Sequence, residues 1–169
     1  IFAPNFVRLE IMRNIVKAVE NGAKIKGIIC EKPMARNLQE ADVMARMVKA
    51  INVPNAYFEN QLHMPCVVEA RNQLKAVEKT MGSVHLSRSA EEHGGPHEPW
   101  FWDPTRQGGG VCCDMGCHSI AVGMFTLTPG GKAPDYLTPV SVTANMALLK
   151  WGKKPWINKL KERGVDYTA

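Results

Sequence analysis

The sequence predicts an α/β fold: half of a doubly wound parallel sheet followed by an α+β segment. Residues 1–60 carry the main signal, because apolar residues at helical spacing alternate there with short apolar runs, in the order helix, strand, helix, strand. Residues 61–169 change character, with one long helical pattern, two alternating strand patterns and a long loop. We therefore expect two structural regions, the first of which ends near residue 57.

The first helix and the first strand are defined by their ends. Asn5 can cap a helix in which apolar residues recur every three or four positions, and Asn21-Gly22 supplies its stop. Residues 24–30 then read as a strand that ends in Gly-Ile-Ile-Cys and is apolar on both faces, as in an interior strand of a parallel sheet. The tripeptide Glu-Lys-Pro at 31–33 follows at the carboxyl end of this strand.

The next elements alternate in the same way. Asn37 and Glu40 resemble a capping box that opens a second helix, and a short strand is expected over 56–59. A strand, helix, strand order of this kind is typical of a parallel βαβ unit. Pro65 can then start a long helix that runs through about Glu78.

Later segments predict further strands on either side of a functional loop. Residues 84–88 and 140–146 each alternate between apolar and polar side chains, so we expect two half-exposed strands. Residues 91–110 form a loop that is longer than a simple connection requires, and loops of this length are usually functional or disordered. The Trp and Phe residues of the loop favour order.

The loop ends in three glycines, Gly108–Gly110, which precede an acidic and a basic side chain. If Gly110 opens a helix, Asp114 and His118 share one helical face, with their Cβ atoms roughly 5–6 Å apart. The neighbouring residues are mostly apolar, so we expect a buried helix on which this pair needs a partner or a function. The glycines would let the backbone pass close to a ligand. An ordinary exposed Asp and His pair is the alternative.

Composition narrows the setting of the protein. The chain has no apolar run approaching the roughly 18 residues of a membrane span, so we expect a soluble protein without a membrane partner. The net charge is +5, but the basic residues are dispersed apart from a late cluster, which we interpret as solvated surface, so nucleic acid is not an expected partner. Five cysteines, an odd number without a framework, favour reduced thiols and a cytoplasmic location.

The tripeptide at 31–33, followed downstream by the glycine run, Asp114 and His118, resembles the glucose-fructose oxidoreductase, inositol dehydrogenase and MocA (Gfo/Idh/MocA) family of NAD(P)-dependent dehydrogenases. Three further segments share the likeness, so that it spans essentially the whole chain. These segments are the Ala-Pro-Asn turn at 3–5, residues 60–65 and the aromatic stretch from His97 to Trp102.

The resemblance implies an architecture and an activity. Residues 1–57 would form the C-terminal part of a Rossmann-type dinucleotide-binding domain. Residues 58–169 would begin an α+β substrate and oligomerisation domain with an open, mainly antiparallel sheet, through which copies of the chain would form a homo-oligomer. The implied reaction transfers hydride between NAD or NADP and a secondary alcohol of a sugar, polyol or related compound.

The resemblance also implies the roles of individual residues. Lys32 would contact the reacting hydroxyl and the nicotinamide ribose, His118 would exchange the proton, and Asp114 would set the substrate and the histidine. An imidazole that titrates near neutral pH and a cation beside a developing alkoxide suit this chemistry. The expected cofactor contacts are Pro4, Asn5, Glu31, Lys32, Pro33 and Trp102. The expected substrate contacts are Asn60, Lys32, Asp114 and His118.

Two other interpretations stay open. The sequence has no Gly-x-Gly-x-x-Gly after any strand, so we expect it to begin inside the nucleotide-binding domain, and a non-catalytic truncated fragment is the first alternative. A metal site formed by Cys112, Cys113, Cys117 and His118 is the second. These residues crowd a single helix, whereas tetrahedral sites usually draw on separated elements, so we expect no metal and buried, small cysteines.

Overall fold

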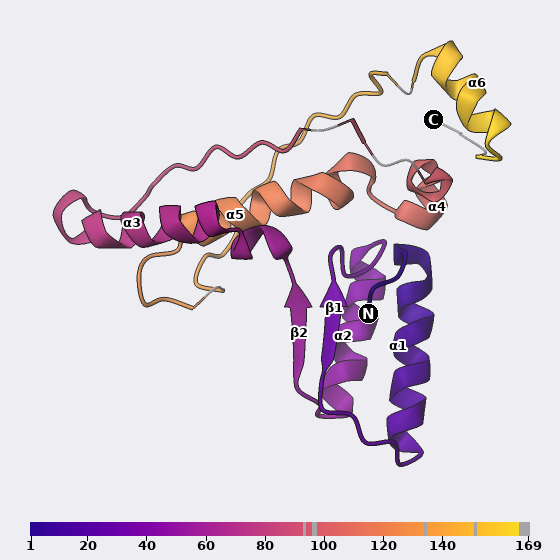
Figure 1. Ribbon diagram of the computed structural model, residues 1–169, viewed down its shortest axis with the longest axis horizontal. Helices are drawn as coiled ribbons and strands as arrows, with labels where there is room; N and C mark the ends of the chain where they lie inside the picture. Colours follow the sequence, from indigo (N-terminus) through magenta and orange to yellow (C-terminus); the bar gives the residue numbers. More distant parts are fainter. Residues whose placement is uncertain (93, 96–97, 134, 151, 166–169) are drawn as a thin grey trace. The chain divides into compact units, whose positions relative to one another are not determined.

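The computed structural model describes residues 1–92, 94–95, 98–133, 135–150 and 152–165. Its elements (Figure 1) are, in order, α1 (Asn5–Glu20), β1 (Ile28–Glu31), α2 (Leu38–Ala50), β2 (Asn55–Phe58), η1 (Asn60–His63), α3 (Pro65–Met81), η2 (Pro99–Trp102), α4 (Pro104–Gln107), η3 (Cys112–Gly116), α5 (Cys117–Leu127) and α6 (Lys154–Glu162).

Contacts within the chain divide it into two compact units. Unit 1 comprises Ile1–Phe58, Gly94–Asp114 and Leu148–Ala169, and unit 2 comprises Glu59–His93 and Met115–Ala147. The predicted assignment of residues 58–169 to a separate substrate domain concerns the domains of a whole enzyme and stays a prediction.

Unit 1 is built on a parallel βαβ unit. β1 and β2 pair in parallel, with Ile28 opposite Asn55 and Glu31 opposite Phe58, and α2 connects the two strands. α1 and α2 lie side by side next to this strand pair (Figure 1). The predicted order helix, strand, helix, strand is therefore confirmed. Buried side chains of these elements form one apolar core: Met12, Ile28, Cys30, Ala35, Met44 and Val48.

The predicted C-terminal end of α1 is confirmed, but its predicted N-terminal cap is not. Pro4 occupies the N-terminal cap position and Asn5 is the first helical residue, so the prediction that Asn5 caps the helix is wrong. The Asn5 amide instead donates a hydrogen bond of 2.9 Å to the Gln107 carbonyl oxygen. The stop is as predicted, because Asn21 ends the helix and Gly22 adopts a φ of 96°.

α2 begins where its sequence predicts. The Asn37 side chain accepts a hydrogen bond of 2.9 Å from the Glu40 N–H, as a helix cap does. The Glu40 carboxylate in turn binds the Arg36 guanidinium and accepts from the Arg36 N–H at 3.2 Å. These hydrogen bonds with Arg36 lower the pKa of the Glu40 carboxyl.

β1 is shorter and more exposed than predicted. It spans Ile28–Glu31 rather than 24–30, and its side chains alternate between buried and exposed. Ile28 and Cys30 are each 6% exposed, whereas Ile29 is 59% exposed. The prediction of burial on both faces is wrong, because the helices described in unit 1 cover only one face of the strand. β2, expected over 56–59, forms over Asn55–Phe58 with all of its residues exposed.

Unit 2 contains α3 and α5, with η1 in contact with both helices. α3 begins at Pro65 as predicted and ends at Met81, with Gly82 as its C-terminal cap. A buried Arg71 links α3 to the end of α5, because its guanidinium donates to the carbonyl oxygens of Thr126 at 3.4 Å and Pro129 at 3.3 Å. The charge of Arg71 is thus placed against the electronegative C-terminal end of a helix.

The two later strands do not form. Residues 84–88 and 140–146 have no regular secondary structure, and Leu86, Val140 and Val142 are 70%, 98% and 86% exposed. Alternation produces a strand only where a neighbouring chain completes the backbone hydrogen bonds, and no such neighbour occurs among the described residues. The described sheet is two-stranded and parallel, so the open antiparallel sheet implied by the resemblance is not observed in it.

The loop over 91–110 is ordered where it is described, as its aromatic residues predict. It contains η2 and α4, and the Trp100 and Phe101 rings stack with centroids 3.8 Å apart. Trp100 also meets the Phe6 ring of α1 edge-on, with centroids 5.9 Å apart. His97, part of the family resemblance, lies outside the described residues.

The helical segment after the glycines is less buried than predicted. Val111 and Ile120 are 71% and 57% exposed. The stretch Pro104–Leu127 is long enough to cross a membrane, and an 18-residue window within it has a mean hydropathy of 1.3, contrary to the expectation of no such segment. One such helix is weak evidence for a membrane span, and Gly108, with a φ of 96°, separates α4 from the rest of the stretch.

Candidate functional site

Lys32 lies at the carboxyl end of β1, inside unit 1, and is paired with Asp114. Its Nζ donates to the Asp114 carbonyl oxygen at 2.7 Å and to Oδ1 at 3.1 Å. The two side chains are only 16% and 14% exposed, so a charged pair is held largely out of water. The peptide bond between Lys32 and Pro33 is cis. The fold therefore holds the Lys32 ammonium, mostly shielded from water, at the carboxyl end of β1.

Arg8 of α1 holds the backbone of the Glu-Lys-Pro tripeptide. Its guanidinium donates to the carbonyl oxygens of Ala3 at 2.6 Å and Lys32 at 3.1 Å, and also to those of Glu31 and Pro33. Burial lowers the pKa of Arg8. Sequence reasoning missed this role. The available signal was a cation one turn before the buried Met12 on the apolar stripe of the first helix.

Gln107 joins the same region from the end of α4. It is 1% exposed, its carbonyl oxygen accepts from Asn5, and its Oε1 accepts from the Gly110 N–H at 2.6 Å. Two polar atoms in this unit, Gln107 Nε2 and Glu31 Oε2, are buried without a hydrogen-bond partner in the part of the chain that the structure describes. Buried polar groups of this kind are usually paired, so they are candidates to face a ligand.

The glycine run serves packing within unit 1, and its close approach to a ligand stays a prediction. A Cβ at Gly108 would collide with the Arg36 carbonyl oxygen, and one at Gly109 would lie 2.7 Å from the Cys113 Cβ. Gly110, by contrast, has open space around it and a φ of 59°. Two of the three glycines are thus required by close neighbours within unit 1.

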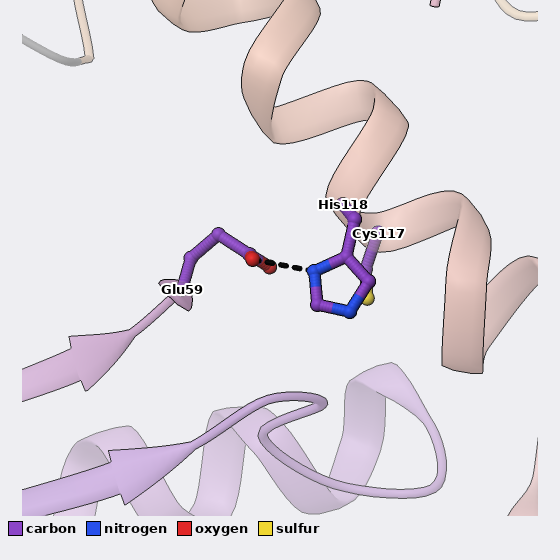
Figure 2. Close-up of side chains that lie close together, drawn as sticks. All are labelled: Glu59, Cys117 and His118. Carbon is purple, nitrogen blue, oxygen red and sulfur yellow. Dashed lines mark hydrogen bonds and ion pairs between the residues drawn. The ribbon is translucent and has the colours of Figure 1, made fainter. Parts of the chain in front are cut away.

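The second cluster lies in unit 2 and pairs His118 with Glu59 (Figure 2). Glu59 Oε1 and His118 Nδ1 are 2.5 Å apart, and the side chains are 4% and 7% exposed. The same oxygen accepts from the Gln61 N–H at 3.1 Å, so Glu59 also caps η1. Cys117 lies beside the pair, and the ligand atoms of the three residues are all within 4.8 Å of one another.

Glu59 was missed in the sequence. It is the last residue of the predicted strand over 56–59, directly before the predicted substrate contact Asn60. A charged residue that closes an apolar strand was the only available signal. Its histidine partner lies 59 positions further along the chain, and no local pattern reports such a contact.

Asp114 and His118 thus each have their own partner. Asp114 belongs to unit 1 and pairs with Lys32, whereas His118 belongs to unit 2 and pairs with Glu59. The helix is a π-helix over Cys112–Gly116, so the regular spacing assumed for a shared face does not apply there. The expectation of one cleft shared by Lys32, Asp114 and His118 stays a prediction.

The remaining predicted contacts are placed as follows. Trp102 is half-buried at the end of η2, and Asn60 is exposed at the start of η1. Pro4 and Pro33 are half-buried. An open apolar pocket of about 300 Å³ in unit 1 lies over the core residues Met12 and Met44 and is lined by neither Lys32 nor Asp114.

The cysteines give a mixed result. Cys112 is exposed and Cys113 and Cys117 are half-buried, so the expectation of buried thiols is wrong for Cys112. Among the described residues, the group that could hold a metal ion is Glu59, Cys117 and His118. This group differs from the all-helical one considered from the sequence, because Glu59 comes from a separate element.

No protein-family model matches the chain. It is 28% identical over 109 residues to protein YMR315W of Saccharomyces cerevisiae, a match that covers 64% of this chain and 30% of the yeast protein. A structure of GenD2 from gentamicin A biosynthesis, in complex with NAD, is similar with a TM-score of 0.63 and 26% identity, over 74% of this chain and 34% of GenD2. An NAD-binding oxidoreductase from Klebsiella pneumoniae is similar in fold, with a TM-score of 0.52, 21% identity and coverage of 74% and 32%.

The chain therefore spans about a third of the length of each of these proteins. The likenesses support a partial Rossmann-like fold of the type found in NAD-binding oxidoreductases, in agreement with the parallel βαβ unit of unit 1.

Proposed function

We propose that this chain is part of an NAD-dependent oxidoreductase of the Gfo/Idh/MocA type, which transfers hydride between the nicotinamide and a secondary alcohol of a sugar, polyol or related compound. The observation that carries the proposal is the nearly buried Lys32–Asp114 pair at the carboxyl end of β1. Ligands of open α/β sheets bind at this end of the strands. The similarity to GenD2, whose structure contains NAD, supports the choice of cofactor.

The residues at this end of β1 fit the nicotinamide half of a dinucleotide. Glu31 Oε2 is a buried acceptor and Gln107 Nε2 a buried donor, both without a partner among the described residues. Ribose hydroxyls and a carboxamide require acceptors and donors of these kinds. We propose Pro4, Asn5, Glu31, Lys32, Pro33 and Trp102 as the residues that would hold the cofactor. When bound, the nicotinamide ring accepts or returns the hydride.

The side chains of this chain supply the remaining chemistry. As the alcohol is oxidised, its hydroxyl must lose a proton, and His118 accepts it at the ring nitrogen that does not face Glu59. The Lys32 ammonium stabilises the negative charge that develops on the alcohol oxygen, and this effect is strong where water is excluded. Asp114 fixes the position of that ammonium. Asn60 is proposed as a further substrate contact.

The assembly and location follow from the same proposal. We infer a cytoplasmic location, because the five cysteines form no disulfide with one another. We further propose a homo-oligomer that binds neither nucleic acid nor membrane. Light scattering of the full-length protein tests the oligomer. A monomer at working concentration would remove this part of the proposal.

The test of the function uses the full-length protein that contains this segment. It is assayed for NAD reduction with a panel of sugars, cyclic polyols and linear polyols, and the matched variants are Lys32→Met and the exposed Lys26→Met. We expect Lys32→Met to lower kcat by roughly 10²–10⁴, the scale of a lost positioned electrostatic contact, and Lys26→Met to leave it unchanged. A kcat of Lys32→Met equal to that of Lys26→Met, or an absence of NAD reduction with every secondary alcohol, would exclude the function.

A further inference from the structure

We propose that Glu59 is the positioning residue that orients His118 as a proton acceptor. The inference rests on the proposed function, and it assigns to Glu59 a role that the family resemblance gives to Asp114. In unit 2, Glu59 Oε1 lies 2.5 Å from His118 Nδ1, while in unit 1 the Asp114 carboxylate is held by Lys32 at 3.1 Å. Each carboxylate thus has a separate basic partner.

The chemistry of the contact fixes which ring nitrogen carries the proton. An ionised carboxylate can only accept hydrogen bonds, so a neutral His118 facing Glu59 must carry its proton on Nδ1. Nε2 is then unprotonated and is the atom that can take a proton from a hydroxyl group. Once Nε2 is protonated, Nδ1–H still donates to Glu59, so the ring keeps its orientation.

Glu59 is held firmly enough to impose this orientation. The oxygen that faces His118 also accepts the Gln61 N–H at 3.1 Å, and this second bond ties the carboxylate to the first turn of η1. η1 packs against α5, the helix that carries His118, so the two elements that present the pair are in direct contact within unit 2. A side chain fixed by two hydrogen bonds and by packing is preorganised for a positioning role.

A metal ion is the competing explanation for the cluster in Figure 2, since Cys117 lies beside the pair. Two ligands of one tetrahedral zinc lie roughly 3.3 Å apart, because each is about 2.0–2.1 Å from the ion. Glu59 Oε1 and His118 Nδ1 lie at hydrogen-bonding distance, 2.5 Å, so the two atoms face one another as a donor and an acceptor. The geometry therefore favours a hydrogen-bonded pair.

The test reads the ring nitrogens directly, by NMR of the full-length protein labelled with ¹⁵N in histidine. His118→Gln identifies the signals, and Glu59→Gln is compared with Glu59→Asp. Glu78→Gln is the matched control, because Glu78 also accepts two hydrogen bonds in unit 2, from the Gly130 N–H at 2.9 Å and the Ser83 hydroxyl at 3.0 Å, but faces no imidazole.

We expect the neutral wild-type ring of His118 to be protonated on Nδ1 and bare on Nε2. Glu59→Gln should abolish this preference, since an amide can donate as well as accept, while Glu59→Asp retains it at least in part and Glu78→Gln retains it fully. A wild-type ring protonated on Nε2, or a Glu59→Gln ring identical to the wild type, would overturn the inference. Stoichiometric zinc in the purified protein that is lost in Cys117→Ser would also overturn it.

Kinetics separate this inference from the proposed function. Glu59→Gln should lower kcat by roughly 10²–10⁴ with KM nearly unchanged, as expected when the catalytic ring persists in the wrong tautomer. Unchanged kcat in Glu59→Gln, with His118→Gln inactive, would remove the positioning role alone. If the ring behaves as expected but His118→Gln transfers hydride at the wild-type rate, the orientation by Glu59 stands and the proposed function fails.

Discussion

Replacing Arg8 with methionine tests how the Glu-Lys-Pro tripeptide is held. Methionine keeps much of the apolar volume of the arginine stem but removes every donor. Four carbonyl oxygens, those of Ala3, Glu31, Lys32 and Pro33, then lose a hydrogen bond from the guanidinium.

The magnitude follows from these bonds. A hydrogen bond to a charged group contributes about 1.5–3 kcal/mol, but bonds that share one guanidinium are not additive. Arg8 is itself 4% exposed, and the cost of burying its charge offsets part of the gain. We therefore expect Arg8→Met to lower the free energy of unfolding by about 1.5–3 kcal/mol, because the variant leaves neutral carbonyl oxygens unpaired but no buried charge.

Urea denaturation followed by circular dichroism measures the change. Arg13→Met is the control, because Arg13 lies exposed on the same helix and its loss should shift the unfolding free energy by less than about 0.5 kcal/mol. In the full-length protein, Arg8→Met should also lower kcat, since the backbone that carries Lys32 loses its support. A destabilisation below about 1 kcal/mol would refute the reasoning that the guanidinium organises this segment.

Three further predictions follow from local geometry. Gly108→Ala should lower the free energy of unfolding by roughly 1–3 kcal/mol more than Gly110→Ala does. Both glycines have a positive φ, but only a Cβ at Gly108 would collide with a neighbouring carbonyl oxygen. Equal melting temperatures of the two variants would contradict this. The exposed Cys66 should be alkylated faster than Cys113, because burial raises the pKa of the Cys113 thiol. The alkylation rate of Cys113 should also keep rising with pH above the range in which an ordinary thiol ionises. Mass spectrometry over a pH series measures both rates. The pKa of Glu40 is lowered in the folded state, so its ion pair with Arg36 should stabilise the fold above about pH 4.3. This stability should disappear as the pH falls through the folded pKa, and Glu40→Gln should remove it. A destabilisation by Glu40→Gln that is the same at every pH would count against the ion pair.

The sequence predicted those parts of the fold that depend on neighbours along the chain. The cap at Asn37, the stop at Gly22 and the start at Pro65 are decided within a few residues, and all three are confirmed. The strands predicted at 84–88 and 140–146 are wrong, because an alternating segment forms a strand only with a partner strand.

The residues of the candidate site could be predicted from local sequence, but their partners could not. Lys32 could be selected from its chemistry and its place at the end of an apolar run, and its partner Asp114 was also singled out. The pairing itself joins residues 82 positions apart, and Glu59 and Arg8 act through contacts of the same long-range type. Side-chain type thus indicates which residues are reactive, whereas the partner that sets their charge or tautomer emerges only from the folded chain.

The uncovered face of β1 and β2 governs how the isolated chain behaves at concentration. On the face of the strand pair opposite Cys30, Ile29 and Phe58 are 59% and 36% exposed and present an apolar surface to another copy. At low salt the net charge of +5 keeps copies apart. Added salt screens that repulsion over about 8–10 Å without weakening apolar attraction, so colloidal stability should be best in dilute buffer and should decline as ionic strength rises.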